Sequence, residues 1–451
     1  MFKSTTCSQY IRLFLLLAAV TQQSTGTNVV NRRLADFARE AISSLQREDG
    51  SFRFDLDGVL GLKSVLMKGV ATFTKTGRTQ QFREAIDPEA FMNATQLIES
   101  KGFPCETHHP ITEDGYVLGM QRMPQPSKTR EPVFLLHGLL SSSDCFLTNL
   151  VNESLAYILY NAGYDVWLGN VRGNRYSRKH VTMSPDDLEF WDWSFDQMGQ
   201  YDVPAMINHI LNVTGHPRVH YIGHSQGTTS LFTGVMRNGR SLADKVKSFI
   251  ALAPAALVPN MQSPLHYLMY LANDIDLVYN LFGQGDFLPH DGLLETVSKL
   301  LCPYEQKICQ NLFFLIGGTD FTNTNVSRIP VYSAHDPSGT STQNMLHWAQ
   351  MFGNKEDTMK YYDYGYIKNF KRYGQVHPPR YNFSDFTVPT YAFCGYSDTL
   401  VVLQDCKKLM TLLPNVREAT FIPHYTHLDF IFAMNSPQVL YSRVLKILAA
   451  S

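Results

Sequence analysis

From about residue 110 onward, short apolar runs alternate with amphipathic stretches. The apolar runs predict strands at Tyr116–Met120, Pro132–Leu136, Asp165–Leu168, Val219–Ile222, Ser248–Ala251, Thr390–Phe393 and Ala419–Ile422. Several are almost continuously apolar, as strands are when both faces of their sheet are covered. The stretches between them predict helices, for example over Leu155–Ala162, Met198–Leu211 and Thr229–Arg237. This alternation is typical of an α/β fold with a mostly parallel central sheet.

The alternation of strands and helices is interrupted between the predicted strands Ser248–Ala251 and Thr390–Phe393. The 252–389 segment between them is far longer than one crossover between neighbouring strands needs. We therefore predict an inserted cap domain over residues 256–383. The α/β core would be split around it, into a first part over residues 86–255 and a second part over residues 384–451. Residues 27–85 precede the core as an extension or an excised pro-segment.

The first residues have the pattern of a signal peptide over residues 1–26. Lys3 and Arg12 precede the apolar run Leu13–Val20, and small and polar residues follow as far as Gly26. The alternative is an ordinary N-terminal core helix. The apolar run is too short to span a bilayer, and no later run reaches that length, so we expect no transmembrane segment.

A signal peptide predicts a secreted or lysosomal protein, and two further observations agree with it. The chain carries N-glycosylation sequons at Asn93, Asn152, Asn212, Asn325 and Asn382. Once Cys7 is removed with the signal peptide, six cysteines remain. Cys302 and Cys309 are the favoured disulfide pair because they are close in sequence and lie in a polar-rich loop. Cys394 ends an apolar strand, and we expect a buried thiol there.

Charge excludes one class of partner. The chain has 39 Lys and Arg against 40 Asp and Glu, a net charge of −1. No basic field attracts nucleic acid, so no nucleic-acid partner is expected. No histidine pair has helical zinc spacing with a third ligand, and no glycine-rich phosphate loop occurs. The sequence therefore predicts neither a metal nor a cofactor.

The most informative motif is Gly-x-Ser-x-Gly at Gly223–Gly227, between an apolar run and a helix-permissive run. This context is typical of a nucleophile elbow, a strand followed by a tight turn and a helix. Gly223 and Gly227 would relieve crowding around a strained Ser225 and leave its hydroxyl accessible. The alternative is a Gly-Ser turn between two core elements.

A serine nucleophile needs a base, and the base needs a group that orients it. In an α/β-hydrolase the order along the chain is Ser, acid, His. Asp398 follows the strand Val388–Cys394, and His427 follows the strand Thr420–Pro423. Both therefore have the expected order and the expected place at strand ends.

Three other residues compete for these roles. Asp405 lies on the helix after Asp398 and is interpreted as a surface charge. Asp429 is interpreted as a carboxylate at a helix N-terminus. His424 follows its strand immediately and would point away from the site, so His427 is favoured as the base.

An oxyanion hole needs two backbone N–H groups directed at the developing charge. Gln226, directly after the nucleophile, would supply one of them. The strand exit Phe134–Leu140 contains His137 and Gly138, and Leu139 would supply the second. Read alone, His137-Gly138 is also compatible with an ordinary strand exit.

At this point the chain resembles the acid lipase family, which includes lysosomal acid lipase and gastric lipase. The resemblance covers nearly everything after residue 86. It rests on segments at Asp87–Asn93, Thr112–Val117, His137–Leu140, Gly169–Asn174, Gly223–Gly227 and His427–Phe430. It implies an α/β-hydrolase core with a helical cap and a mobile lid, and it looks closest to the digestive lipases of insects. Residues 27–85 exceed the family's usual N-terminus, and the loop between Cys302 and Cys309 is shorter than that of the family's cap disulfide.

The resemblance implies hydrolysis of triacylglycerols or sterol esters, and Ser225, Asp398, His427, Leu139 and Gln226 fall on the family's catalytic and oxyanion positions. The expected partner is a lipid ester at a lipid–water interface, reached by transient contact with a membrane or emulsion surface. Two alternatives stay open, a carboxylesterase for small soluble esters and a non-catalytic lipid-binding or yolk-type storage protein.

Overall fold

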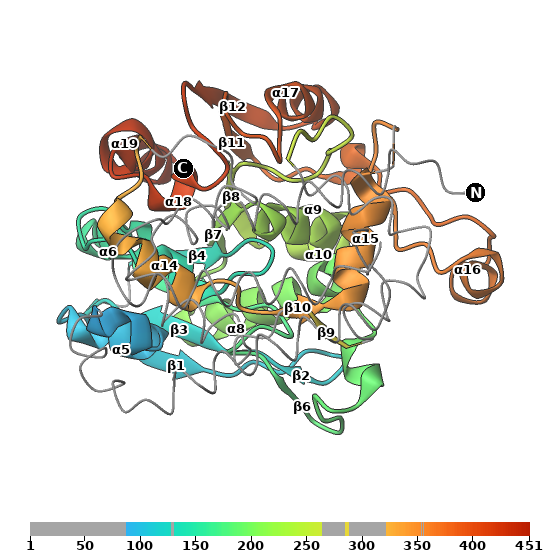
Figure 1. Ribbon diagram of the computed structural model, residues 1–451, viewed down its shortest axis with the longest axis horizontal. Helices are drawn as coiled ribbons and strands as arrows, with labels where there is room; N and C mark the ends of the chain where they lie inside the picture. Colours follow the sequence, from blue (N-terminus) through green and yellow to red (C-terminus); the bar gives the residue numbers. More distant parts are fainter. Residues whose placement is uncertain (1–86, 128–129, 264–284, 288–321, 353, 355) are drawn as a thin grey trace, which may run out of the picture.

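The computed structural model describes residues 87–127, 130–263, 285–287, 322–352, 354 and 356–451 (Figure 1). The predicted signal peptide at 1–26, the extension at 27–85 and the pair Cys302 and Cys309 lie outside these residues. So does much of the predicted cap, whose limits at 256 and 383 stay a prediction.

The centre of the fold is an eight-stranded sheet with the order β1-β3-β5-β4-β7-β8-β11-β12. All neighbours from β5 to β12 pair in parallel, whereas β3 runs antiparallel to both β1 and β5. The predicted α/β fold with a mostly parallel sheet is therefore confirmed. The strands are β1 Glu106–His108, β3 Met120–Met123, β4 Pro132–Leu136, β5 Asp165–Gly169, β7 Val219–His224, β8 Val246–Leu252, β11 Thr390–Gly395 and β12 Val416–Ile422.

Both faces of this sheet are buried, which explains the continuous apolar runs. In β4, Phe134 and Leu136 join one core with residues of α8 (Val203–Thr214) and α9 (Gln226–Asn238). Val133 and Leu135 join the opposite core with residues of α6 (Leu155–Asn161) and α19 (Ser442–Ala450). Successive side chains of a strand point to opposite faces, so two helical layers need apolar residues at every position.

The predicted strand Tyr116–Met120 is in fact two strands. β2 (Tyr116–Val117) pairs with β6 (Lys179–His180) in a separate ladder, and β3 begins at Met120. The break falls at Gly119, where an added Cβ would lie 2.5 Å from the carbonyl oxygen of Tyr176. The sequence missed β1 because this edge strand is polar and largely exposed.

The helix predicted over Met198–Leu211 begins with one π-turn. Residues Met198–Asp202 form this turn, and α8 continues to Thr214, where Gly215 ends it with a left-handed φ of 75°. At Gly199 an added Cβ would lie 2.0 Å from the Thr233 hydroxyl of α9. The irregular turn thus lets the backbone approach α9 closely.

The remaining elements surround this core. Between β8 and β11 the described residues contain the short ladder of β9 (Asp286–Phe287) with β10 (Thr340–Ser341) and three α-helices, α14 (Ile329–His335), α15 (Thr342–Phe352) and α16 (Tyr366–Tyr373). The other α-helices of the described residues are α5 Ala94–Ser100, α7 Phe195–Gln197, α10 Arg240–Ala243, α17 Leu403–Leu412 and α18 Asp429–Phe432. Short 3-10 helices span Pro88–Phe91, Ser143–Phe146, Leu188–Trp191, Val326–Arg328 and Phe383–Asp385, and a second π-turn spans Pro437–Tyr441.

None of the five sequon asparagines is fully buried. Asn93, Asn152, Asn212 and Asn382 are exposed, and Asn325 is half-buried. Which of them carry glycans stays a prediction.

Candidate active site

Ser225 lies at the turn between the carboxyl end of β7 and the start of α9. Its φ of 52° and ψ of −122° place a non-glycine residue in a conformation that costs free energy. The turn is held by two hydrogen bonds, in which the Ser225 N–H donates to the Leu252 carbonyl (3.0 Å) and the Ser225 carbonyl accepts from the Thr228 N–H (2.8 Å). The predicted strand, turn and helix are thus all present.

The elbow glycines lie where no side chain fits. A Cβ added at Gly223 would lie 2.8 Å from the carbonyl carbon of Gly227. One added at Gly227 would lie 2.2 Å from the Leu136 carbonyl oxygen at the end of β4. Small residues at these positions therefore let the elbow pack against β4 and its exit loop.

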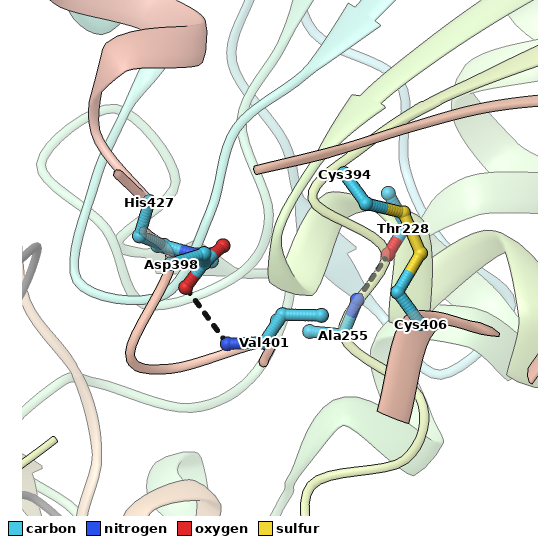
Figure 2. Close-up of a disulfide and its surroundings, with 7 residues drawn as sticks. All are labelled: Thr228, Ala255, Cys394, Asp398, Val401, Cys406 and His427. Atoms are coloured by element: carbon cyan, nitrogen blue, oxygen red, sulfur yellow. Dashed lines mark hydrogen bonds and ion pairs between the residues drawn. A yellow bond between two sulfur atoms is a disulfide. The ribbon is translucent and has the colours of Figure 1, made fainter. Parts of the chain in front are cut away.

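Asp398 and His427 form a buried hydrogen-bonded pair beyond β11 and β12 (Figure 2). Nδ1 of His427 lies 2.8 Å from Oδ2 of Asp398. The other oxygen, Oδ1, accepts from the N–H groups of Leu400 (2.9 Å) and Val401 (2.8 Å). With both carboxylate oxygens engaged, Asp398 has a fixed orientation and can hold the His427 ring in one tautomer.

A second contact ties His427 to the elbow. Nε2 of His224, directly before Ser225, lies 2.9 Å from the His427 carbonyl oxygen. Burial, with His427 beside it, lowers the pKa of His224 to about 3, so this ring is neutral and donates to that carbonyl. The β7 elbow and the loop after β12 are thereby joined next to Ser225. Sequence reasoning gave His224 no role, although its place beside the candidate nucleophile could have suggested one.

The competing residues lie elsewhere. His424 is exposed and has a φ of 62°, and its direction relative to the site stays a prediction. Asp429 begins α18, as expected, and accepts from the Thr426 N–H (2.7 Å) and hydroxyl. The interpretation of Asp405 as a surface charge is wrong. Its carboxylate is buried on α17 and accepts from the backbone and side chain of Asn260 at 3.1 and 2.6 Å.

The expectation of a buried thiol at Cys394 is also wrong, because Cys394 forms a disulfide with Cys406 (Figure 2). Cys394 lies at the end of β11 and Cys406 on α17, so the bond closes the loop that carries Asp398. The sequence did not suggest this pair because a cysteine in an apolar strand has the pattern of a core residue. Among the described cysteines, Cys105 and Cys145 are free.

Replacing both bonded cysteines by alanine should destabilise the fold. Closing a loop of this length removes entropy from the unfolded chain, so Cys394→Ala/Cys406→Ala should lower the free energy of unfolding by about 2–4 kcal/mol. Urea unfolding checks this value, with Cys105→Ala as the control for the loss of a free thiol. A double variant as stable as Cys105→Ala would contradict a structural role for the bond.

The loop after β4 lies directly against the elbow. A Cβ added at Gly138 would lie 3.1 Å from the Ser225 Cβ. Burial lowers the pKa of His137 to about 4, so its ring is neutral. Its Nδ1 donates to the Gly138 carbonyl (2.8 Å), and its Nε2 accepts from the Val171 N–H (3.3 Å). His137 therefore fixes the loop that presents Leu139.

The side chain of Gln226 is hydrogen-bonded to two residues of the helix α15, a contact that we call the α15 clasp. Its Oε1 accepts from Nδ2 of Asn344 (2.9 Å) and from Nε1 of Trp348 (2.6 Å), and all three residues are buried. Nε2 of Gln226 points toward the Met198 sulfur (3.5 Å). With the side chain held in this way, the backbone N–H of Gln226 lies in the first turn of α9, where helix N–H groups lack intrahelical partners. Asn344 and Trp348 are too distant in sequence from Gln226 for any local pattern to reveal the contact.

Comparisons with known proteins agree with this geometry. Residues 131–433 match the alpha/beta hydrolase fold family, and residues 94–150 match the partial alpha/beta-hydrolase lipase region. Gastric triacylglycerol lipase of Mus musculus is 43% identical over 372 residues, which cover 80% of this chain and 93% of the relative. The lysosomal acid lipase/cholesteryl ester hydrolase of Homo sapiens is 42% identical over 373 residues, or 81% of this chain and 92% of the relative.

This chain belongs to the acid lipase family. The predicted family and the α/β-hydrolase fold are thereby confirmed, and so is the enzyme class of carboxylic ester hydrolase. Because both relatives are mammalian, the likeness to insect digestive lipases stays a prediction. In the described part of this acid lipase, no helix combines the length and the apolar character needed to cross a membrane. Within the same residues, no three ligating side chains are grouped to hold a metal ion.

A buried acidic cluster packs behind the loop of this acid lipase that presents Leu139. Asp144 accepts from Arg175 (3.0 Å) and Tyr176 (2.7 Å) and pairs with Nδ1 of His335 (2.8 Å). These contacts hold the pKa of Asp144 at about 2 despite burial. For the neighbouring Asp336, burial close to the Asp144 charge raises the pKa to about 7. One carboxylate of the cluster is therefore charged in acid and the other is neutral.

Asp336 should make stability depend on pH. Between the usual aspartate pKa and about 7, the folded state holds a proton that the unfolded state releases. Stability from this group is therefore lost as pH rises through that window, by up to about 4 kcal/mol. Asp336→Asn mimics the neutral form, so its stability gain over wild type should increase from pH 5 to pH 8 in urea unfolding. A gain that is independent of pH would contradict the assignment, and Asp244→Asn, which removes an exposed carboxylate, is the control substitution.

Proposed function

We propose that this chain is a lipase of the secretory pathway that hydrolyses carboxylic esters of lipids, namely triacylglycerols, sterol esters or both. The observation that carries the proposal is the buried pair of Asp398 and His427, hydrogen-bonded to the elbow of Ser225 through His224. A base held in one tautomer next to a half-buried serine at a tight turn is the arrangement that ester hydrolysis through an acyl-enzyme needs.

In the first half of the proposed reaction, Ser225 attacks the ester carbonyl. His427, with Nδ1–H held by Asp398, accepts the serine proton on Nε2. The tetrahedral intermediate then collapses, His427 gives the proton to the leaving alcohol, and the acyl group stays on the Ser225 oxygen. Asp398 stabilises the charged imidazolium during these steps.

The second half reverses the roles. His427 takes a proton from water, the hydroxide attacks the acyl carbonyl, and the fatty acid leaves as the Ser225 hydroxyl regains its proton. In both halves the negative carbonyl oxygen would accept from the backbone N–H groups of Leu139 and Gln226. The contacts of His137 and of the α15 clasp support this role, because preorganised donors need no reorganisation during the reaction.

The proposed substrate class and cellular location of this chain rest on the two relatives described above. Those named above are a triacylglycerol lipase and a cholesteryl ester hydrolase, and we extend both ester classes to this chain. Their names are gastric and lysosomal, which supports secretion or delivery to lysosomes for a chain with a predicted signal peptide. An acid pH optimum follows from the same relationship.

The test is hydrolysis by the secreted protein of a long-chain triacylglycerol emulsion, a cholesteryl ester emulsion and a partly soluble short-chain ester, from acid to neutral pH. We expect acid-range activity on at least one emulsion and a rate on the short ester that rises sharply above its solubility limit. Saturation below that limit, with no activity on emulsions, would instead identify an esterase for soluble substrates. Folded protein inactive on all three would identify a binding or storage protein.

A further inference from the structure

The helix α16 carries apolar side chains that face solvent. Tyr366, Ile367 and Phe370 are exposed by 69%, 74% and 61%, and we call these three residues the α16 patch. They lie within about one turn of the helix, so they share one side of it. Figure 1 shows α16 at the outer edge of the fold, beyond α15 and away from the central sheet. Large apolar side chains gathered in this way indicate an interaction surface.

The surroundings of the α16 patch are basic. Lys368 and Lys371 are exposed on the same helix, and Arg372 follows them. Residues 364–382 contain four Lys and Arg and no Asp or Glu. An amphipathic helix with aromatic and aliphatic residues on one side and lysines beside them is typical of elements that lie in a lipid–water interface.

Hydrogen bonds of two residues of α16 hold the helix that carries the patch. Asn369, the buried residue of α16, accepts from the Tyr364 N–H (2.8 Å) and donates to the Val376 carbonyl (2.9 Å). Arg372 donates to Asp192 (2.9 Å) and lies over the Tyr364 ring. Because these contacts tie α16 to the chain segments on either side of it and to Asp192, its exposed side chains need less ordering on binding.

We propose that α16 docks this protein on a lipid surface that carries anionic head groups. Tyr366, Ile367 and Phe370 enter the boundary between head groups and acyl chains, while Lys368 and Lys371 contact the anionic head groups. This inference rests on the proposed function and deepens it by naming the surface element that meets the substrate phase. A second copy of the chain fits less well, because a symmetric contact through α16 would bring like charges together.

The docking element connects to the candidate site through α15. Gln343 of α15 donates to the Tyr364 hydroxyl (3.3 Å), and Gln350 of α15 exchanges hydrogen bonds with the backbone of Asp363. α15 also carries Asn344, which clasps Gln226. A lipid surface bound at α16 thus lies one packed helix away from the proposed oxyanion hole.

The test measures partition of the secreted protein onto vesicles of ether-linked phosphatidylcholine, with or without ether-linked phosphatidylglycerol. Neither lipid has a carboxylic ester bond to hydrolyse, so binding is measured independently of catalysis. Lys368→Gln/Lys371→Gln should weaken partition onto the anionic vesicles by roughly thirtyfold. Ile367→Ser/Phe370→Ser should weaken partition onto both vesicle types by at least about tenfold. The matched control is Val439→Ser/Lys446→Gln, which removes an exposed apolar residue and an exposed lysine at the C-terminal end.

Phe370→Trp gives a direct readout, since its fluorescence should shift to the blue when vesicles are added. The proposal is overturned if wild type binds neither vesicle, or if the α16 variants partition like the control. It is also overturned if those variants change only the oligomeric state, which would identify a second copy as the partner. Hydrolysis of a short soluble ester by the same samples reports catalysis separately. Vesicle binding without any ester hydrolysis would leave docking supported and contradict the proposed function.

Discussion

Ser225→Ala should lower ester hydrolysis by about 10⁶-fold, to the level that binding and the oxyanion donors sustain without a nucleophile. The reason is chemical, because alanine offers no oxygen for the acyl group and His427 has no serine proton to accept. The strained turn has space for the smaller side chain, and the backbone bonds of Ser225 to Leu252 and Thr228 do not involve its hydroxyl. The fold should therefore persist. The measurement is initial rates on the best emulsion substrate and on a short soluble ester.

Two observations accompany this measurement. Ser241→Ala, which removes an exposed hydroxyl from α10, should keep the wild-type rate. A covalent serine-directed phosphonate should label the wild type but not Ser225→Ala, which connects the lost rate to the lost nucleophile. Wild-type activity in Ser225→Ala would contradict the assignment of Ser225 as the nucleophile, and the elbow would then be a structural turn.

Substituting the two histidines beyond β12 should separate the base from its neighbour. His427→Asn should lower hydrolysis by about as much as the loss of the serine, because the three residues act as a unit. His424→Asn should leave the rate within about twofold, since an exposed side chain is far more tolerant of change. Asparagine is used at both positions so that the two substitutions match, and it tolerates the positive φ of His424.

The two histidine variants test the assignment of the base whichever of them loses activity. Both variants should keep thermal melting temperatures near that of wild type, with His427→Asn lower because its ring hydrogen bond with Asp398 is buried. If instead His424→Asn were inactive and His427→Asn active, the exposed ring would have to reach Ser225 in a rearranged state. The Asp398–His427 pair would then be a structural contact.

The fold was predictable because the central strands of its sheet, such as β4, β5 and β7, are buried on both faces. Continuous apolar runs such as Pro132–Leu136 need no partner to be recognised, and that strand has the predicted limits. The edge strand Glu106–His108 has no such run and was missed. The Tyr116–Met120 strand was predicted as one element because the close approach of Gly119 to Tyr176 depends on tertiary packing. Local patterns thus reveal burial, but they do not reveal which distant backbone lies nearby.

The same distinction holds at the candidate site. Ser225, Asp398 and His427 could be proposed because each follows an apolar strand. The partners that fix them could not, since the clasp of Asn344 and Trp348 on Gln226 joins positions more than a hundred residues apart. Asp405 was interpreted wrongly because its buried contact with Asn260 cannot be recognised from the order of apolar and polar residues along α17. Cys394 was misread for the same reason, because its bond to Cys406 depends on where α17 packs.

The clasp on Gln226 limits how this enzyme can be redesigned. Its amide oxygen accepts from Asn344 and Trp348, which belong to the segment between β8 and β11. A chimera that receives the inserted segment of another hydrolase, in order to acquire its substrate preference, would lose both donors unless the transplant supplies equivalents. The buried amide oxygen would then lack its partners at the residue next to the nucleophile. A graft of the segment between β8 and β11 should therefore carry the asparagine and tryptophan of α15 with it.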